Sequence, residues 1–125
     1  MFIVLLDEPM LFVFDSETHA AGAIEPPDAE SEIRAAFDDE GVPYRVEWIT
    51  PNEHKKLPTL FGSVASVSFG EYQFVPAGPA DLPALIGLLE DHPDTNPPEA
   101  RPAVDALLSR VRAERDRTVE RDDAE

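Results

Sequence analysis

Three histidines, two adjacent lysines and 26 carboxylates are the side chains of this 125-residue chain with the most obvious chemistry. His19, His54 and His92 are too far apart in the sequence to form a local metal-binding motif. A lone histidine in a loop is more often a plain solvated residue than a ligand. The sequence therefore predicts no metal site and no cofactor, although a site assembled in three dimensions around these histidines stays open.

Both lysines, Lys55 and Lys56, lie in the segment NEHKKLP, residues 52–58. A catalytic lysine needs burial or a cationic neighbour to lower its pKa, and the surrounding Asn, Glu and Pro residues indicate water instead. A second interpretation makes the pair an internal counter-ion for acidic residues elsewhere in the chain. We interpret the segment as a solvated connecting loop.

Other catalytic signatures are absent from the sequence. The six glycines are scattered, so no phosphate-binding loop is formed, and no serine has the flanking glycines of a nucleophile elbow. The absence of cysteine excludes thiolate nucleophiles and disulfides. Neighbouring carboxylates are frequent, but none has the apolar surroundings that would raise a pKa for acid–base catalysis. We therefore predict no catalytic residue and a protein that is not an enzyme.

The net charge of −16 and its distribution carry the most information about function. Residues 1–53 hold 13 acidic and 2 basic residues, a net charge of −11, whereas residues 54–96 carry −3 and residues 97–125 carry −2. Such a field repels nucleic acid and anionic membranes and attracts basic proteins. We expect no direct binding to nucleic acid or to a membrane.

Apolar patterning predicts an α+β fold. Short alternating or β-branched segments indicate strands at 2–6, 10–14, 44–48, 63–69 and 72–75. Helical spacing indicates helices at 17–24, at 29–40, from Leu82 to Leu89 and from Arg101 to Val111. Hairpin-linked strands with interspersed helices predict a mainly antiparallel sheet of four to five strands with two to three helices, packed as a two-layer sandwich with the helices on one face.

Turn and capping residues set the predicted boundaries. Ser16, Asp28 and Asp81 are expected N-caps. Pro26-Pro27 should end the first helix and Gly41 the second. Gly70-Glu71 should form a tight turn between 63–69 and 72–75, and the proline-rich segment 92–98 should be a linker.

The chain is expected to form a single α+β domain over residues 1–111. Residues 112–125 are expected to be a charged C-terminal helix extension or a frayed tail. The N-terminal segment MFIVLLDEP lacks a basic region and is interrupted by Asp7, so it predicts neither a secretion signal nor a membrane span. We expect a cytoplasmic protein.

These observations predict a non-catalytic acidic binding protein that masks a basic protein surface, of the immunity-protein or inhibitor type, with a toxin-like or nuclease-like partner. Asp38-Asp39-Glu40 should close the helix at 29–40. The macrodipole at a helix C-terminus disfavours acidic residues by about 0.3–1 kcal/mol each. Their placement there indicates either a functional patch or an exposed site where this cost in free energy has little effect. Trp48, Tyr44 and Tyr72 are possible aromatic anchors, with a core position favoured for Trp48. The candidate partner-binding residues are Asp28, Glu32, Asp38, Asp39, Glu40, Glu47 and Tyr44.

Two alternatives remain at this stage. The acidity could instead reflect adaptation to high salt, or the chain could be an uncharacterised small enzyme with a pocket that the sequence does not reveal. The uneven distribution of charge favours the partner, because adaptation to solvent should spread charge evenly. The sequence predicts no particular oligomeric state.

Overall fold

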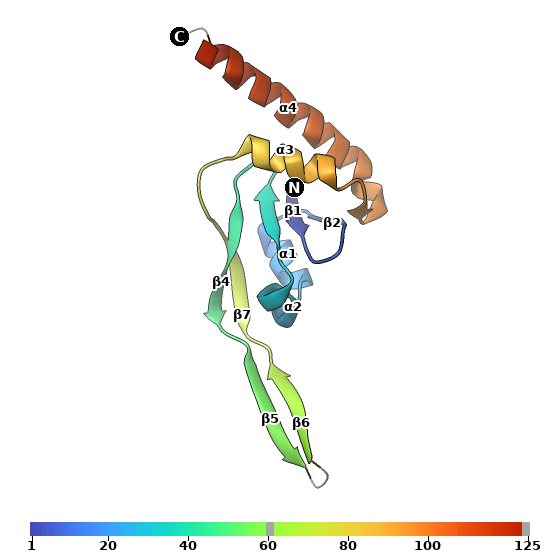
Figure 1. The fold of residues 1–125 in the computed structure, drawn as a ribbon, viewed down its shortest axis with the longest axis vertical. Coiled ribbons are helices and arrows are strands. Elements are labelled where there is room, and N and C mark those ends of the chain that lie inside the picture. Colours follow the sequence, from blue (N-terminus) through green and yellow to red (C-terminus); the bar gives the residue numbers. More distant parts are fainter. Residues whose placement is uncertain (60–61, 124–125) are drawn as a thin grey trace.

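The computed structural model describes residues 1–59 and 62–123, with side chains described for residues 1–54 and 69–120. The predicted α+β class is confirmed: a mixed four-stranded sheet is combined with helices and two two-stranded ribbons (Figure 1). The sheet has the order β3-β1-β2-β8, with β1 (Phe2–Leu5), β2 (Leu11–Phe14), β3 (Ala35–Asp38) and β8 (Thr95–Asn96).

Strand β1 is central in this sheet. It pairs antiparallel with β2, where Ile3 lies opposite Val13, and with β3, where Ile3 lies opposite Phe37. The strands predicted at 2–6 and 10–14 are therefore confirmed, and they form a hairpin. Strand β8 runs parallel to β2, with Leu11 opposite Thr95. The predicted linker at 92–98 thus contributes an edge strand, which its proline-rich composition concealed.

Successive side chains of β1 enter two separate cores, because side chains alternate across a strand. Ile3 packs in a cluster with α3 (Leu82–Asp91) and α4 (Arg101–Asp123). Phe2 and Val4 pack on the opposite face with α1 (Glu17–Ala23), α2 (Pro26–Ser31) and the ribbon strand β7 (Glu71–Pro76). The sheet is thus covered on both faces, whereas the order of elements had indicated helices on one face.

The helix predicted at 29–40 is wrong. The structure has the short helix α2, a turn and then strand β3. The apolar positions Ala29, Ile33, Ala36 and Phe37 satisfy helical spacing, but Ala36 and Phe37 are buried through pairing with β1 instead. Pro26-Pro27 begins α2 rather than ending α1, as proline fits the first turn of a helix, and Glu25 rather than Asp28 is the N-cap residue.

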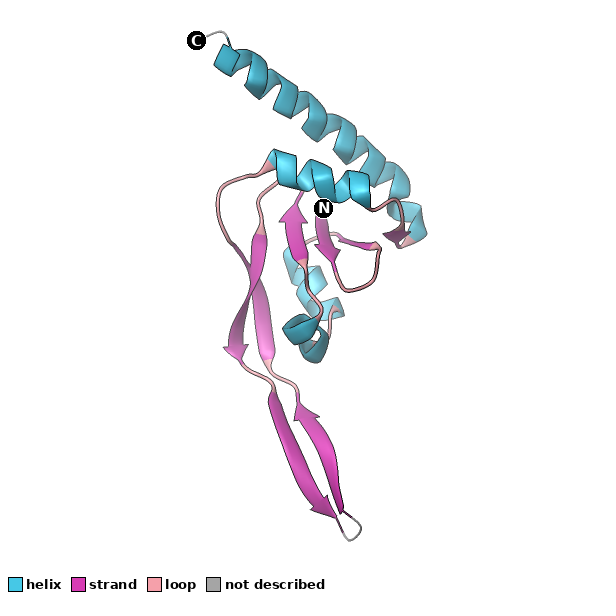
Figure 2. Ribbon diagram, in the orientation of Figure 1, coloured by secondary structure: helices cyan, strands magenta, loops and turns pink. Residues whose placement is uncertain are grey.

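The hairpin predicted around Gly70-Glu71 is also wrong. Strand β4 (Tyr44–Thr50) pairs with β7, and β5 (Glu53–Thr59) pairs with β6 (Gly62–Ser68). The segment NEHKKLP is therefore largely strand rather than loop, and the three interpretations of the Lys55 and Lys56 side chains lie outside the described residues. We call the β5–β6 hairpin the arm; it extends away from the rest of the molecule (Figure 2).

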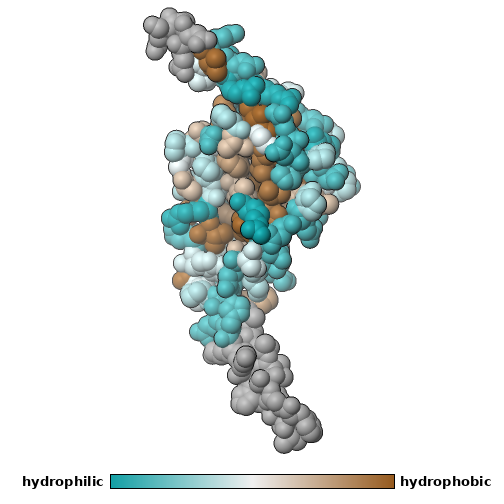
Figure 3. Space-filling view, viewed as in Figure 1, coloured by the Kyte–Doolittle hydropathy of each residue, from teal (hydrophilic) through white to brown (hydrophobic). Residues whose placement is uncertain are grey.

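The predicted caps of the other helices are confirmed. The Ser16 side chain accepts a hydrogen bond from the His19 amide at 3.1 Å, and Asp81 accepts one from the Ala84 amide at 3.1 Å. Helix α4 packs against the core with buried side chains up to Val111. Beyond Val111 the helix extends away from the core, and its surface is mostly hydrophilic (Figure 3). Within the described residues, each helix falls short of either the length or the apolar character that crossing a bilayer requires.

Candidate partner-binding site

A hollow of about 360 Å³ opens beside the β1–β2 hairpin and helices α1 and α2. Its apolar lining comes largely from Leu6, Phe12, Phe14 and Ile24. Phe12 and Phe14 lie two residues apart on β2, so their side chains share one face of the strand. Both side chains are half-buried. The β1–β2 hairpin and the end of α1 therefore form an apolar floor that stays open to solvent.

Three carboxylates lie at this hollow: Glu8 in the β1–β2 turn, Asp28 on α2 and Glu32 at the end of α2. Repulsion from Asp28 raises the pKa of Glu32, with further contributions from burial and from the charges of Asp7 and Glu8. Arg34 hydrogen-bonds to Asp7. Among the side chains that the structure describes, no cation forms an ion pair with Glu8, Asp28 or Glu32. The hollow thus joins apolar surface to three carboxylates that form no ion pair with a described side chain, and we call it the acidic hollow.

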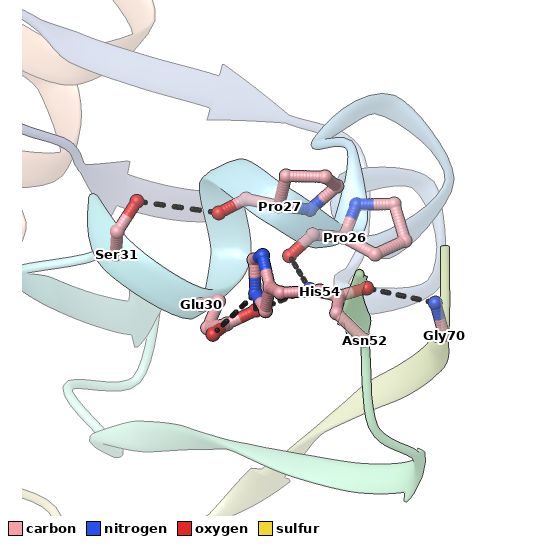
Figure 4. A network of polar contacts seen from close by, with 7 residues as sticks. All are labelled: Pro26, Pro27, Glu30, Ser31, Asn52, His54 and Gly70. Carbon is pink, nitrogen blue, oxygen red and sulfur yellow. Dashed lines mark hydrogen bonds and ion pairs between the residues drawn. The ribbon is translucent and has the colours of Figure 1, made fainter. Parts of the chain in front are cut away.

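Glu30, two residues before Glu32, has side-chain partners within the chain, and its pKa is shifted in the opposite direction to that of Glu32 (Figure 4). The Asn52 side-chain amide donates to Glu30 Oε2 at 2.7 Å, and His54 Nε2 lies 3.1 Å from both Glu30 carboxylate oxygens. The hydrogen bond from Asn52, followed by the interaction with His54, lowers the pKa of Glu30. Asn52 also donates to the Pro26 carbonyl oxygen and accepts a hydrogen bond from the Gly70 amide. These contacts fasten the base of the arm to α2.

Asp38 is the last residue of β3, and Asp39 and Glu40 lie in the turn that leads to β4. None of the three closes a helix, so the macrodipole argument for them is wrong. Asp38 Oδ1 accepts hydrogen bonds from the Glu40 and Val42 amides at 2.9 and 3.0 Å. Asp39 Oδ2 lies 3.3 Å from the N-terminal ammonium group. Asp38 and Asp39 therefore have structural partners within the chain, and they lie apart from the lining of the acidic hollow.

The remaining predicted residues lie on β4. Glu47 contacts Arg45 at 3.4 Å and accepts a hydrogen bond from Gln73 at 3.2 Å. The half-buried Tyr44 packs edge-on against Phe2 at 5.0 Å and donates to Asp38 Oδ2 at 3.2 Å. Burial, followed by the charge of Asp38, raises the pKa of Tyr44.

The two other aromatic candidates belong to the second core. Tyr72 is buried, and its hydroxyl donates to the Ile24 carbonyl oxygen at 2.6 Å. Burial raises the pKa of Tyr72 to about 12. Trp48 is half-buried against Tyr72, with ring centroids 5.4 Å apart. Tyr72 therefore supports the apolar floor from within, through the residue Ile24 that lines the acidic hollow.

The histidines have separate environments. The His19 ring packs edge-on against Phe14 at 5.7 Å, His54 contacts Glu30, and His92 Nδ1 lies 2.8 Å from the Leu88 carbonyl oxygen. The described residues contain no cluster of three or more histidine, aspartate or glutamate side chains arranged to hold a metal ion.

Of the seven predicted partner-binding residues, the structure brings Asp28 and Glu32 together at one hollow and places the others elsewhere. Sequence reasoning missed Glu8 and the apolar lining. All five residues of the predicted strand 10–14 are apolar, so no alternation in the sequence marked Phe12 and Phe14 as the residues that line the hollow.

Comparison of the chain with protein-family models, with curated proteins and with solved structures found no match. The fold and the site define a small α+β protein that has an apolar hollow lined in part by three carboxylates and, separately, a projecting β-hairpin arm (Figure 1).

Proposed function

We propose that this protein is a non-catalytic acidic binding protein that masks a basic surface of another protein, in the manner of an immunity protein or inhibitor. The observation that carries the proposal is the acidic hollow, where Glu8, Asp28 and Glu32 surround an apolar floor without a described counter-ion. The partner is of the toxin or nuclease class, because such proteins expose cationic surfaces that bind nucleic acid.

The chemistry of the acidic hollow suits an arginine or lysine side chain. The aliphatic stem of such a residue can pack against Phe12 and Phe14, while its charged head meets Asp28 and Glu32. Pockets for small molecules hold about 300–1,000 Å³, so a hollow near the lower end of that range suits a single protruding side chain. The net charge of −16 adds long-range attraction, which raises association rates by roughly 10–1,000-fold at low salt.

Affinity capture from the native lysate tests this function. The immobilised full chain should retain a basic protein at about 50 mM salt and release most of it at about 500 mM, because the Debye length shortens several-fold over that range. Recovery of no basic protein at either salt concentration would contradict the proposal. If the protein instead unfolds at low salt, the acidity is better explained by adaptation to high salt.

A further inference from the structure

A second apolar hollow, of about 400 Å³, adjoins the acidic hollow. Phe14 lines both, so the two hollows meet at this residue. The rest of the apolar lining comes from the N-terminal residue, from β2 and from the segment that leads into α4: Met1, Val13, Pro97, Ala100 and Ala103. We call this second hollow the edge hollow, because it lies at an edge of β2 that β8 does not cover.

The short length of β8 leaves the edge hollow open. Strand β8 pairs with the first two residues of β2 and then ends. Two prolines, Pro97 and Pro98, follow it, and proline has no amide hydrogen with which to continue a sheet. The chain instead enters the 3₁₀ helix η1 (Pro98–Ala100) and α4. Val13 and Phe14, the last two residues of β2, therefore pair with β1 on one side and line the edge hollow beyond the end of β8.

Two carboxylates also line the edge hollow: Asp15, directly after β2, and Glu99 on η1. Both residues are exposed, and no side chain in the described part of the chain forms an ion pair with either. Met1 also lines this hollow, but its ammonium group lies 3.3 Å from Asp39 Oδ2 and is paired there. The edge hollow thus repeats the chemistry of the acidic hollow, with apolar surface next to carboxylates that have no described counter-ion.

We propose that the edge hollow receives a second cationic side chain of the same basic partner, so that the contact extends from the acidic hollow across Phe14 to the edge of β2. This inference rests on the proposed function and adds a binding site to it. Charge complementarity identifies the occupant, because an arginine or lysine head can meet Asp15 and Glu99. The aliphatic stem of that residue can pack against Val13 and Phe14.

The size of protein interfaces supports a contact that spans both hollows. A stable interface covers about 800 Å² of each partner, which is more than one side chain in one hollow supplies. A partner bound at the acidic hollow must therefore cover neighbouring surface as well. The edge hollow is adjacent through Phe14 and has the same combination of apolar and acidic lining, so a second basic residue of the partner fits it.

An NMR titration of the full chain with N-acetyl-arginine amide tests the edge hollow without the natural partner. The backbone amide signals of Val13, Asp15 and Glu99 should shift, together with those of Phe12 and Glu32 at the acidic hollow. N-acetyl-citrulline amide, which has nearly the same shape but no charge, is the control and should shift neither set. Shifts confined to the acidic hollow would overturn this inference and leave the proposed function intact. Shifts of equal size along the exposed end of α4 would also overturn it, because the probe would then bind any exposed carboxylate.

Charge variants test the edge hollow in the complex with the basic protein recovered by capture. Asp15→Asn with Glu99→Gln should weaken binding by about tenfold, because both carboxylates would lose their charged partner. Asp116→Asn with Glu120→Gln is the matched control, since it removes the same charge from the exposed surface of α4, and it should leave the affinity nearly unchanged. Thermal melting should show that both variants are folded. Equal losses in the two variants would overturn the inference.

A combined variant tests whether the two hollows hold different side chains of the partner. Adding Asp28→Asn and Glu32→Gln at the acidic hollow to the edge-hollow variant should multiply the two losses of affinity, to about 100-fold, because separate contacts add in free energy. A combined variant that binds no more weakly than the acidic-hollow variant alone would contradict a second side chain in the edge hollow. That result would leave the proposed function, which depends on the acidic hollow, intact.

Discussion

The amide of Glu32 donates a hydrogen bond to the carbonyl oxygen of Asp28 at 2.8 Å, so that the two acids lie one turn apart at the end of α2. Repulsion from Asp28 raises the pKa of Glu32, whereas hydrogen bonds lower the pKa of Glu30 two positions earlier. The two glutamates at the end of α2 therefore differ. Glu30 has hydrogen-bonding partners inside the chain, whereas the negative charge of Glu32 is repelled by neighbouring carboxylates. In the proposed function, a cationic side chain of the partner would reduce this repulsion between Asp28 and Glu32 at the acidic hollow.

Glu32→Gln should stabilise the protein slightly at pH 7. Because the folded-state pKa of Glu32 is raised above the reference value of 4.5, its contribution to stability is present below that value and is lost as pH rises through the folded-state pKa. The variant should therefore melt at a higher temperature than the wild type at pH 7, and the difference should disappear near pH 4. Thermal melting from pH 3.5 to 8 measures this, and an unchanged or lower melting temperature at pH 7 would contradict it.

Asn52→Ala should destabilise the protein by about 1–3 kcal/mol, because it leaves the Pro26 carbonyl oxygen and the Gly70 amide without their hydrogen-bonding partner. Urea unfolding measures the change, and hydrogen exchange at the Gly70 amide should become faster. Gln73→Ala is the control, since the Gln73 side chain is exposed and donates its hydrogen bond to the exposed Glu47 carboxylate. Equal stability of the two variants would show that the base of the arm is not fastened through Asn52.

Gly70→Ala should destabilise by about 1–3 kcal/mol or more, because a Cβ atom there would lie 2.0 Å from the Thr50 carbonyl oxygen. Gly22→Ala should instead stabilise by about 0.5–1 kcal/mol, since Gly22 lies within α1 and a Cβ atom would have no neighbour within 4 Å. Chemical denaturation of both variants measures this contrast. Two variants with the same sign of change would rule out the close approach at Gly70.

Local signals in the sequence predicted the elements whose causes are local. The caps at Ser16 and Asp81 could be predicted from the side chain alone, because each accepts a hydrogen bond from an amide three residues away. The β1–β2 hairpin followed from two apolar segments separated by a short acidic turn.

The errors arise where a distant partner decides the structure. Phe37 fits the apolar stripe of a helix, but pairing with Ile3 holds it in a strand. Segment 63–69 was paired with its nearest neighbour, whereas β6 pairs with β5 and β7 pairs with β4. Asn, Glu and Pro in NEHKKLP favoured a solvated loop, yet proline is tolerated in a strand with an unpaired edge.

The candidate site was predicted in part for the same reason. Asp28 and Glu32 were included because the charge of residues 1–53 is high, and both line the acidic hollow. Glu8 and Phe12 were missed, because the hollow exists only after α1 and α2 fold against the β1–β2 hairpin. Composition indicates that a surface is acidic, but only packing shows where apolar surface meets that charge.

The most direct test of the central claim compares two variants of equal charge in their affinity for the basic protein recovered by capture. Asp28→Asn with Glu32→Gln removes two charges from the acidic hollow, and Asp116→Asn with Glu120→Gln removes two from the exposed surface of α4. The first variant should bind about tenfold or more weakly than the wild type, and the second should bind nearly as well as the wild type. Equal losses of affinity in both variants would show that overall charge, and not the acidic hollow, recruits the partner.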